Sequence, residues 1–134
     1  MRVLVTGHHG YIGSVVAPLL AAHGHEVTGV DTFFYRDCDL RPGPQVESLQ
    51  RDVRDLDEAD LAGYEAVVHL AALSNDPLGD LDPELTFEIN ERASIRLAQA
   101  ARETGVARFL FASSCSMYGV SRPSSFGLTM KLVT

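Results

Sequence analysis

The stretch that decides the fold is Val3-Leu4-Val5-Thr6-Gly7-His8-His9-Gly10-Tyr11-Ile12-Gly13, in which an apolar strand leads into a glycine-rich turn and then directly into an apolar helix. Gly7 lets the chain turn sharply off the strand, where a side chain would cause strain. Gly10 leaves the backbone bare for an approaching phosphate, and Gly13 lets the helix lie close to the strand. The helix N-terminus adds unpaired N–H groups and a partial positive charge. The stretch therefore predicts a site for the pyrophosphate of a dinucleotide.

An acidic residue at the end of the next predicted strand supports this interpretation. Residues 26–31 have a strand pattern, and Asp31 ends it, 18 residues after Gly13. In dinucleotide-binding units a carboxylate about 20 residues after the glycines accepts hydrogen bonds from the adenosine ribose hydroxyls. Because a carboxylate repels a 2′-phosphate, Asp31 favours NAD over NADP. Arg36 is near enough in the sequence to weaken this preference without reversing it.

Length and composition restrict the remaining possibilities. The chain of 134 residues has the length of one domain and can bury a sizeable core. Its net charge of −7 argues against nucleic acid or an anionic membrane as a partner, and no apolar run approaches the roughly 20 residues that cross a bilayer. The N-terminus does not resemble a signal peptide. Cys38 and Cys115 are too isolated for a disulfide framework or a metal site. We therefore expect a cytoplasmic protein with reduced thiols and no bound metal.

Strand and helix patterns alternate along the chain with short connections. Strands are predicted at 2–6, 26–31, 46–51, 66–71 and 107–113, and helical segments at 11–23, 57–62 and 83–104. Asp82 is the expected N-cap of the last helix and Gly105 its end. The expected buried face of that helix is Leu85, Ile89, Ala93, Leu97 and Ala101. The alternation predicts an α/β fold, a Rossmann-type doubly wound parallel sheet of about five strands with helices on both faces.

In such a sheet the ligand lies across the carboxyl ends of the strands, so the residues that follow each strand are candidates for the site. Asp52 is expected to accept the adenine amino group, and Val53 to pack on the adenine ring. The small residues around 70–72 let the backbone pass close to a cofactor. The hydroxyls at 113–116 are a candidate proton-handling site at the nicotinamide end, and the less favoured alternative is a serine-rich turn that caps the next segment.

The histidines near the predicted site are expected to have structural positions. His8 and His9 lie in the glycine turn, where we expect both side chains to be exposed. His69 ends an apolar strand and is expected to be an interior histidine with satisfied hydrogen bonds.

Taken together, these motifs resemble the N-terminal part of an extended short-chain dehydrogenase/reductase of the NAD-dependent sugar-nucleotide epimerase/dehydratase family. The matching pieces are Thr6-Gly-His-His-Gly-Tyr-Ile-Gly13, Asp31, Asp52-Val53, His69-Leu-Ala-Ala72, Asn90 and Ser113-Ser-Cys-Ser-Met-Tyr-Gly119. The resemblance covers residues 1–119 and implies a longer, two-domain enzyme. Such enzymes usually act on a nucleotide-linked sugar by transient oxidation with tightly held NAD.

The resemblance also implies roles for particular residues. The family's proton-handling position falls on Ser114, and Ser74, Asn75 and Asp76 occupy a loop that often borders the substrate. The implied cofactor contacts are Gly7, Gly10, Tyr11, Ile12, Gly13, Asp31, Asp52, Val53, Leu70, Ala71, Ala72 and Asn90.

The C-terminal residues depart from the family pattern. The chemistry needs a Tyr as general base and a Lys four residues later, which anchors the nicotinamide ribose and lowers the Tyr pKa. Here Phe126 stands where the Tyr is expected, and Lys131 follows one residue too late. Tyr118 and Arg122 have the spacing, but arginine holds a ribose differently. Lys131 is retained as the candidate catalytic lysine.

The domain organisation predicted on this basis is an NAD-binding domain at 1–119 and an atypical C-terminal stub at 120–134, with the substrate domain absent and the fold C-terminally truncated. A bare sheet edge and helix face favour self-association, so a homo-oligomer is expected. In the family the helix that begins at Pro83 contributes to a dimer interface.

Three interpretations stay open. The chain is the cofactor half of an NAD-dependent epimerase or dehydratase that acts on a nucleotide-linked sugar. Alternatively, it is a catalytically silent NAD-binding module that acts as a regulator or partner subunit. The third interpretation is a truncated or internally deleted product without activity of its own.

Overall fold

The computed structural model describes residues 1–36, 46–74 and 81–114. Several sequence-based predictions lie outside the described residues. They concern Asn75, Asp76, Lys131, the two cysteines and the whole of the segment at 120–134.

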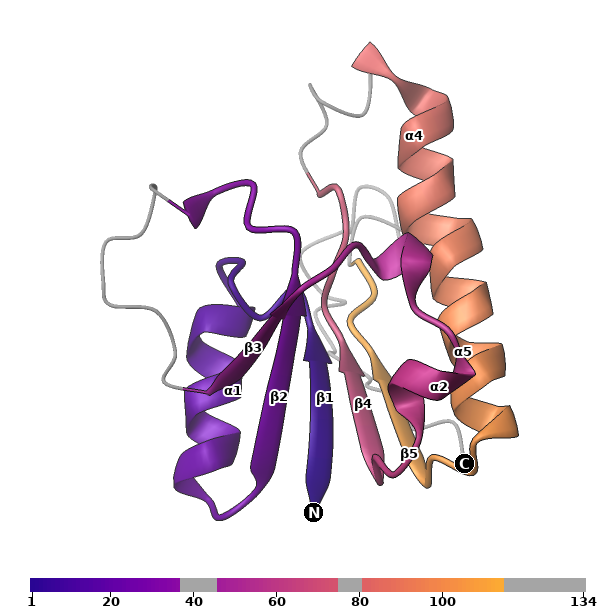
Figure 1. Cartoon of the computed structure of the whole chain (residues 1–134). Coiled ribbons are helices and arrows are strands. Elements are labelled where there is room, and N and C mark those ends of the chain that lie inside the picture. Colours follow the sequence, from indigo (N-terminus) through magenta and orange to yellow (C-terminus); the bar gives the residue numbers. More distant parts are fainter. Residues whose placement is uncertain (37–45, 75–80, 115–134) are drawn as a thin grey trace, which may run out of the picture.

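Within the described residues, five parallel strands form one sheet in the order β3-β2-β1-β4-β5. The strands are β1 (Arg2–Thr6), β2 (Glu26–Asp31), β3 (Glu47–Gln50), β4 (Ala66–His69) and β5 (Arg108–Phe111) (Figure 1). This confirms the predicted fold class. The last three strands are shorter than predicted, because the residues beyond Gln50, His69 and Phe111 leave the sheet.

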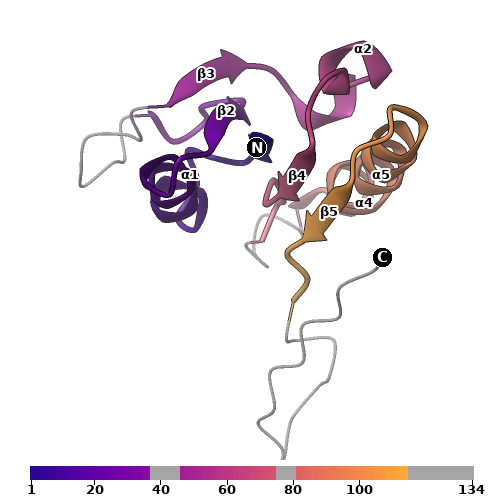
Figure 2. The ribbon, with the colours of Figure 1, turned by 90° about the horizontal axis from the view of Figure 1, so that it is seen from below.

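Helices cover both faces of the sheet, as predicted. α1 (Gly13–Ala22) lies on one face, and α2 (Glu58–Leu61), α4 (Pro83–Phe87) and α5 (Ala93–Glu103) lie on the other (Figure 2). A short 3-10 turn, η2 (Val53–Asp55), precedes α2. No helix in the described ranges combines the length and apolar character that a membrane crossing requires.

Alternation along β1 divides the core into two apolar clusters. Val3 and Val5 pack with Ala17 of α1, whereas Leu4 packs with Leu61 and Leu97 on the opposite face. Successive side chains of a strand point to opposite faces, so β1 contributes to both clusters. The strand is buried from Val3 to Thr6, and this central position fixes where the glycine turn leaves the sheet.

The long helix predicted at 83–104 contains a wider turn in its middle. Asp82 caps α4 as predicted, because its carboxylate accepts a hydrogen bond from the Leu85 amide at 3.0 Å. The segment η3 (Glu88–Arg92) is π-helical and joins α4 to α5. Four of the five residues predicted for the buried face are buried, whereas Leu85 is exposed. Gly105 follows α5 with a positive φ, which confirms the predicted helix end.

Candidate functional site

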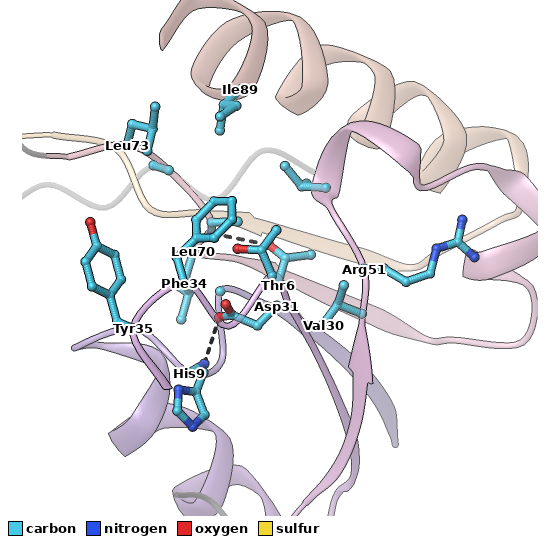
Figure 3. A pocket seen from close by; sticks show the side chains of 16 residues that line it. Thr6, His9, Val30, Asp31, Phe34, Tyr35, Arg51, Leu70, Leu73 and Ile89 are labelled. Atoms are coloured by element: carbon cyan, nitrogen blue, oxygen red, sulfur yellow. Dashed lines mark hydrogen bonds between the residues drawn. The ribbon is translucent and has the colours of Figure 1, made fainter. Parts of the chain in front are cut away.

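A cleft opens at the carboxyl edge of the sheet, between the ends of β1, β2 and β4 (Figure 3). Its position is the point where the strand order reverses between β1 and β4, which is where open α/β sheets bind ligands. Phe34 and Tyr35, from the loop after β2, border it on one side. Seven of the predicted cofactor residues line this cleft: Gly7, Gly10, Asp31, Val53, Leu70, Ala71 and Ala72.

Gly7 brings the turn into close contact with the loop after β4. Its φ of +70° lies in the left-handed region, and a Cβ built there would lie 2.7 Å from the Ala71 nitrogen. The Gly7 amide donates to the Val30 carbonyl at 2.8 Å. A side chain at this position would therefore face both backbone strain and a steric clash.

The other two glycines have different surroundings. A Cβ on Gly13 would lie 2.1 Å from the Gly7 carbonyl oxygen, so the close approach is to the turn itself and not, as predicted, to β1. Gly10 is exposed, and the only atom of the described residues that its Cβ would meet within 4 Å is the Gly7 oxygen, at 3.3 Å. The backbone at Gly10 is thus open on its outer side, as an approaching anion requires.

Asp31 joins the glycine turn to the loop after β2. One carboxylate oxygen accepts from the His9 amide at 3.0 Å and the other from the Phe33 amide at 2.8 Å. An ionised carboxylate can accept about four hydrogen bonds, so these two leave capacity for ligand hydroxyls. The carboxylate lines the cleft (Figure 3).

Arg36 lies over the ring of Phe33. Its guanidinium carbon is 4.7 Å from the Phe33 ring centroid, and it donates to the Gln50 side chain at 3.3 Å. This engagement places its charge on the aromatic loop that follows Asp31.

Asp52 is engaged by Arg54. Three hydrogen bonds of 2.7 to 3.0 Å run from the Arg54 backbone and guanidinium to the Asp52 carboxylate. The side-chain hydrogen bond from Arg54 holds the pKa of Asp52 below its ordinary value, so the carboxylate stays ionised. Asp52 does not line the cleft, whereas the neighbouring Val53 is buried and does.

Asn90 holds the loop that follows β4. Its side-chain oxygen accepts from the Leu73 amide, and its side-chain nitrogen donates to the Leu73 carbonyl, both at 2.8 Å. Both polar atoms of the Asn90 side chain therefore form hydrogen bonds with the Leu73 backbone, and Leu73 lines the cleft. The sequence motif pointed to Asn90, but it did not reveal that the side chain acts through this loop.

A chain of hydrogen bonds next to the cleft runs along the α5 face of the sheet, from Thr6 of β1 through His69 of β4 to Ser94 of α5. Thr6 Oγ1 lies 2.6 Å from His69 Nδ1, and Ser94 Oγ lies 2.8 Å from His69 Nε2. Ser94 donates to the Asn90 carbonyl at 2.8 Å, so it accepts from Nε2–H. Thr6 accepts from the Ala71 amide at 3.4 Å, so it donates to Nδ1. Every partner is satisfied only by neutral His69, and burial lowers its pKa to about 4.

His69 thus matches the prediction of a satisfied interior histidine, whereas the prediction for His8 was wrong. The His8 side chain is completely buried, because the strand beneath it has glycine at position 29. His9 is half-buried and lines the cleft.

Other predicted residues lie away from this cleft. Tyr11 and Ile12 are exposed at the start of α1, and Ser74 is exposed in the loop after β4. Ser114 is exposed beyond the end of β5 and is not among the residues that line the cleft. Within residues 1–36, 46–74 and 81–114, no group of three or more His, Cys, Asp or Glu side chains could hold a metal ion.

The sheet order, the glycine turn and the acidic residue at the end of β2 define a Rossmann-type domain. Residues 3–131 match the family model described as the NAD dependent epimerase/dehydratase family. The chain belongs to this family.

Similar proteins include UDP-glucose 4-epimerase of Corynebacterium glutamicum, which is 36% identical over 121 residues, 89% of this chain and 36% of that protein. The structure resembles UDP-glucose 4-epimerase of Stenotrophomonas maltophila with bound NAD and formylated UDP-arabinopyranose, with a TM-score of 0.80 and 30% identity over 99% of this chain and 43% of that one. It also resembles the complex of Thermus thermophilus UDP-glucose 4-epimerase with NAD, with a TM-score of 0.78 and 31% identity over 96% of this chain and 42% of that one. The chain therefore spans between 36% and 43% of the length of these relatives.

Proposed function

We propose that this chain is the cofactor-binding part of an NAD-dependent epimerase or dehydratase that acts on a nucleotide-linked sugar. The observation that carries the proposal is the direct tie between the glycine turn and Asp31, through the hydrogen bond from the His9 amide. This tie sets a phosphate-binding turn beside a ribose-binding carboxylate at the carboxyl edge of the sheet. The family match and the NAD-bound relatives support the same conclusion.

In this role the residues of the chain bind and orient, and bound NAD supplies a reversible hydride acceptor. The amides around Gly10 hold the pyrophosphate, and Asp31 accepts from the adenosine ribose. Val53 packs against the adenine, with Asp52 beside it. The bare backbone at 70–72 lies beneath the nicotinamide half, and Asn90 keeps that segment in place through Leu73. Contacts by Tyr11, Ile12 and Gly13 at the start of α1 complete the proposed cofactor site.

The catalytic and substrate roles are proposals that rest on the family resemblance. We assign proton handling to Ser114 and the lysine role to Lys131, and we place the sugar near Ser74, Asn75 and Asp76. We also propose that residues 1–119 form the NAD-binding domain, and that the protein is cytoplasmic and homo-oligomeric. Exposed apolar side chains on α4 and α5, among them Phe87 and Ile95, support self-association.

A second candidate function is a catalytically silent NAD-binding module. Phe126 favours it, because phenylalanine has no ionisable hydroxyl to act as the base. Both functions require NAD binding, and turnover of a UDP-sugar in the presence of NAD separates them.

The experiment that tests the proposal is calorimetric titration of the chain with NAD and with NADP, beside the variant Gly10→Glu. We expect NAD to bind more tightly than NADP, because Asp31 repels the 2′-phosphate. Gly10→Glu should abolish binding while leaving the fold intact, since position 10 is exposed and its Cβ requires only a small shift of the Gly7 carbonyl, 3.3 Å away. A folded chain that binds neither nucleotide would contradict the proposal.

A further inference from the structure

His8 is a buried side chain within the glycine turn, and the cofactor contacts proposed above do not use it. Its exposed fraction is 0%, although it stands between Gly7 and His9, which both line the cleft. The imidazole therefore points away from the cleft and into the sheet. A polar ring in such a position needs a partner, because an unsatisfied buried polar group is costly.

The seat of this ring is built by two neighbouring strands. A Cβ on Gly29 of β2 would lie between 2.2 and 2.6 Å from three atoms of the imidazole, so only glycine leaves room for it. Ser48 of β3 lies 2.9 Å from His8 Nε2 through its hydroxyl oxygen. That hydroxyl donates to the Val46 carbonyl at 3.1 Å, so it accepts from the Nε2–H of His8. The seat therefore fixes the place of the ring through Nε2, whereas the buried Nδ1 has no hydrogen-bond partner among the described residues.

The residues on either side of His8 are tied to the same strand. The Gly7 amide donates to the Val30 carbonyl at 2.8 Å, and the His9 amide donates to the Asp31 carboxylate at 3.0 Å. Three consecutive residues of the turn are thus attached to three consecutive residues of β2, at 29, 30 and 31. The imidazole also meets the edge of the Phe33 ring, with 5.4 Å between the centroids.

We propose that His8 is a positioning residue for the phosphate-binding turn, and that Gly29 and Ser48 are its seat. Seated there, the imidazole sets the separation between the amides that receive the pyrophosphate and the carboxylate that receives the ribose. Preset geometry of this kind raises affinity, because the turn loses less freedom when the ligand binds. The inference rests on the proposed NAD-binding function and deepens it.

Substitutions at positions 8, 29 and 48 test whether the packing of His8 against Gly29 and Ser48 supports NAD binding. Gly29→Ala should raise the dissociation constant for NAD by about tenfold, the equivalent of one hydrogen bond to a charged group, because the methyl group displaces the ring and with it the turn. The double variant with His8→Ala should bind NAD about as weakly as either single variant, because both substitutions remove the same packed ring and their effects do not add. Ser48→Ala, at an exposed position on the edge strand, should raise the same constant by about threefold through loss of the acceptor.

A comparison of ADP with adenosine, by NMR titration, distinguishes positioning from general stability. His8→Ala should weaken ADP by about tenfold while changing adenosine by less than about twofold, because only ADP uses the turn. His8→Gln, which retains a side-chain donor for Ser48, should recover most of the ADP affinity. Leu61→Ala is the matched control: it removes a buried side chain of α2, so it should lower the unfolding temperature without changing the ADP-to-adenosine ratio.

The outcomes separate this inference from the proposed function. A wild-type chain that binds neither NAD nor ADP overturns both. A wild-type chain that binds NAD, with unchanged affinity in Gly29→Ala and Ser48→Ala, overturns only the role of His8. Equal losses of ADP and adenosine in His8→Ala would reduce His8 to a structural residue.

Discussion

Asp31 holds the local backbone in place and also sets the proposed preference for NAD over NADP. Its carboxylate holds the His9 and Phe33 amides, so its place is fixed before any ligand arrives. Asp31→Asn keeps the shape of the side chain but removes the charge and one accepting oxygen. We expect weaker NAD binding, by about tenfold, from the lost hydrogen bond to a ribose hydroxyl. The affinity for NADP should fall less or rise, because the repulsion of the 2′-phosphate is removed.

The measurement is the ratio of the NAD and NADP dissociation constants in the two proteins. Arg36→Ala is a useful companion, because its guanidinium lies over Phe33 and should leave the ratio nearly unchanged. An unaltered ratio in Asp31→Asn would mean that another group sets the preference.

For single residues, the sequence predicted those roles that depend only on neighbours close by along the chain. The left-handed backbone of Gly7 and the placement of Asp31 both follow from the local order strand, turn, helix. The burial of His8 depends on Gly29, which becomes its neighbour only through the pairing of β1 with β2. A glycine within an apolar strand was the available signal, because such a residue often marks close approach by another group.

Among the elements, the π-helical turn η3 is the feature that the spacing of apolar residues in the sequence did not predict. The apolar residues Ile89, Ala93 and Leu97 recur every fourth position, a longer repeat than the 3.6 residues of an α-helix. A wider turn keeps them on one buried face, and it contains Asn90. The sequence therefore predicted the existence and caps of this helix, but not the turn that presents Asn90 to Leu73. π-Helical turns of this kind often occur at functional sites.

Asn90→Ala tests how far that element supports the site. The substitution removes both hydrogen bonds to Leu73, so we expect the free energy of unfolding to fall by about 2 kcal/mol. Affinity for NAD should fall as well, because Leu73 and the neighbouring loop line the cleft. Urea unfolding and calorimetric titration measure the two effects. Gln99→Ala, at an exposed position on α5, should change neither. Unchanged NAD affinity in a folded Asn90→Ala variant would limit Asn90 to stability.

In the part of the chain that the structure describes, an apolar cluster lies on each face of the sheet, and a polar chain lies on the α5 face at the carboxyl edge. Leu4 and Val67 belong to one cluster, and Val5 and Ala66 to the other. His69 ends β4, where its ring links Thr6 of the sheet to Ser94 of α5. Since this link is satisfied only by a neutral ring, the packing of α5 on the sheet should depend on pH.

The sign of that dependence follows from the pKa of His69, which burial lowers from 6.5 to about 4. Between these two values the unfolded chain binds a proton that the folded chain does not, so the free energy of unfolding falls as the pH decreases from 6.5 to 4. The stability lost through His69 as the pH falls across this window is about 3 kcal/mol. Burial also lowers the pKa of His8, which adds a loss in the same direction. The stability that Asp52 contributes is present above pH 3.8 and is lost only at lower pH, because its pKa is held below 3.8.

Urea unfolding at several pH values across this window, for the wild-type chain and for His69→Gln, isolates the contribution of His69. Glutamine does not titrate, so the variant should lose much less stability between pH 6.5 and 4 than the wild type, whatever its stability at neutral pH. The slope is the informative quantity, because a cavity or a lost hydrogen bond lowers stability equally at every pH. Parallel slopes in the two proteins would show that the folded and unfolded chains protonate His69 alike, and Thr6 would then accept a hydrogen bond from Nδ1–H while Nε2–H still donates to Ser94.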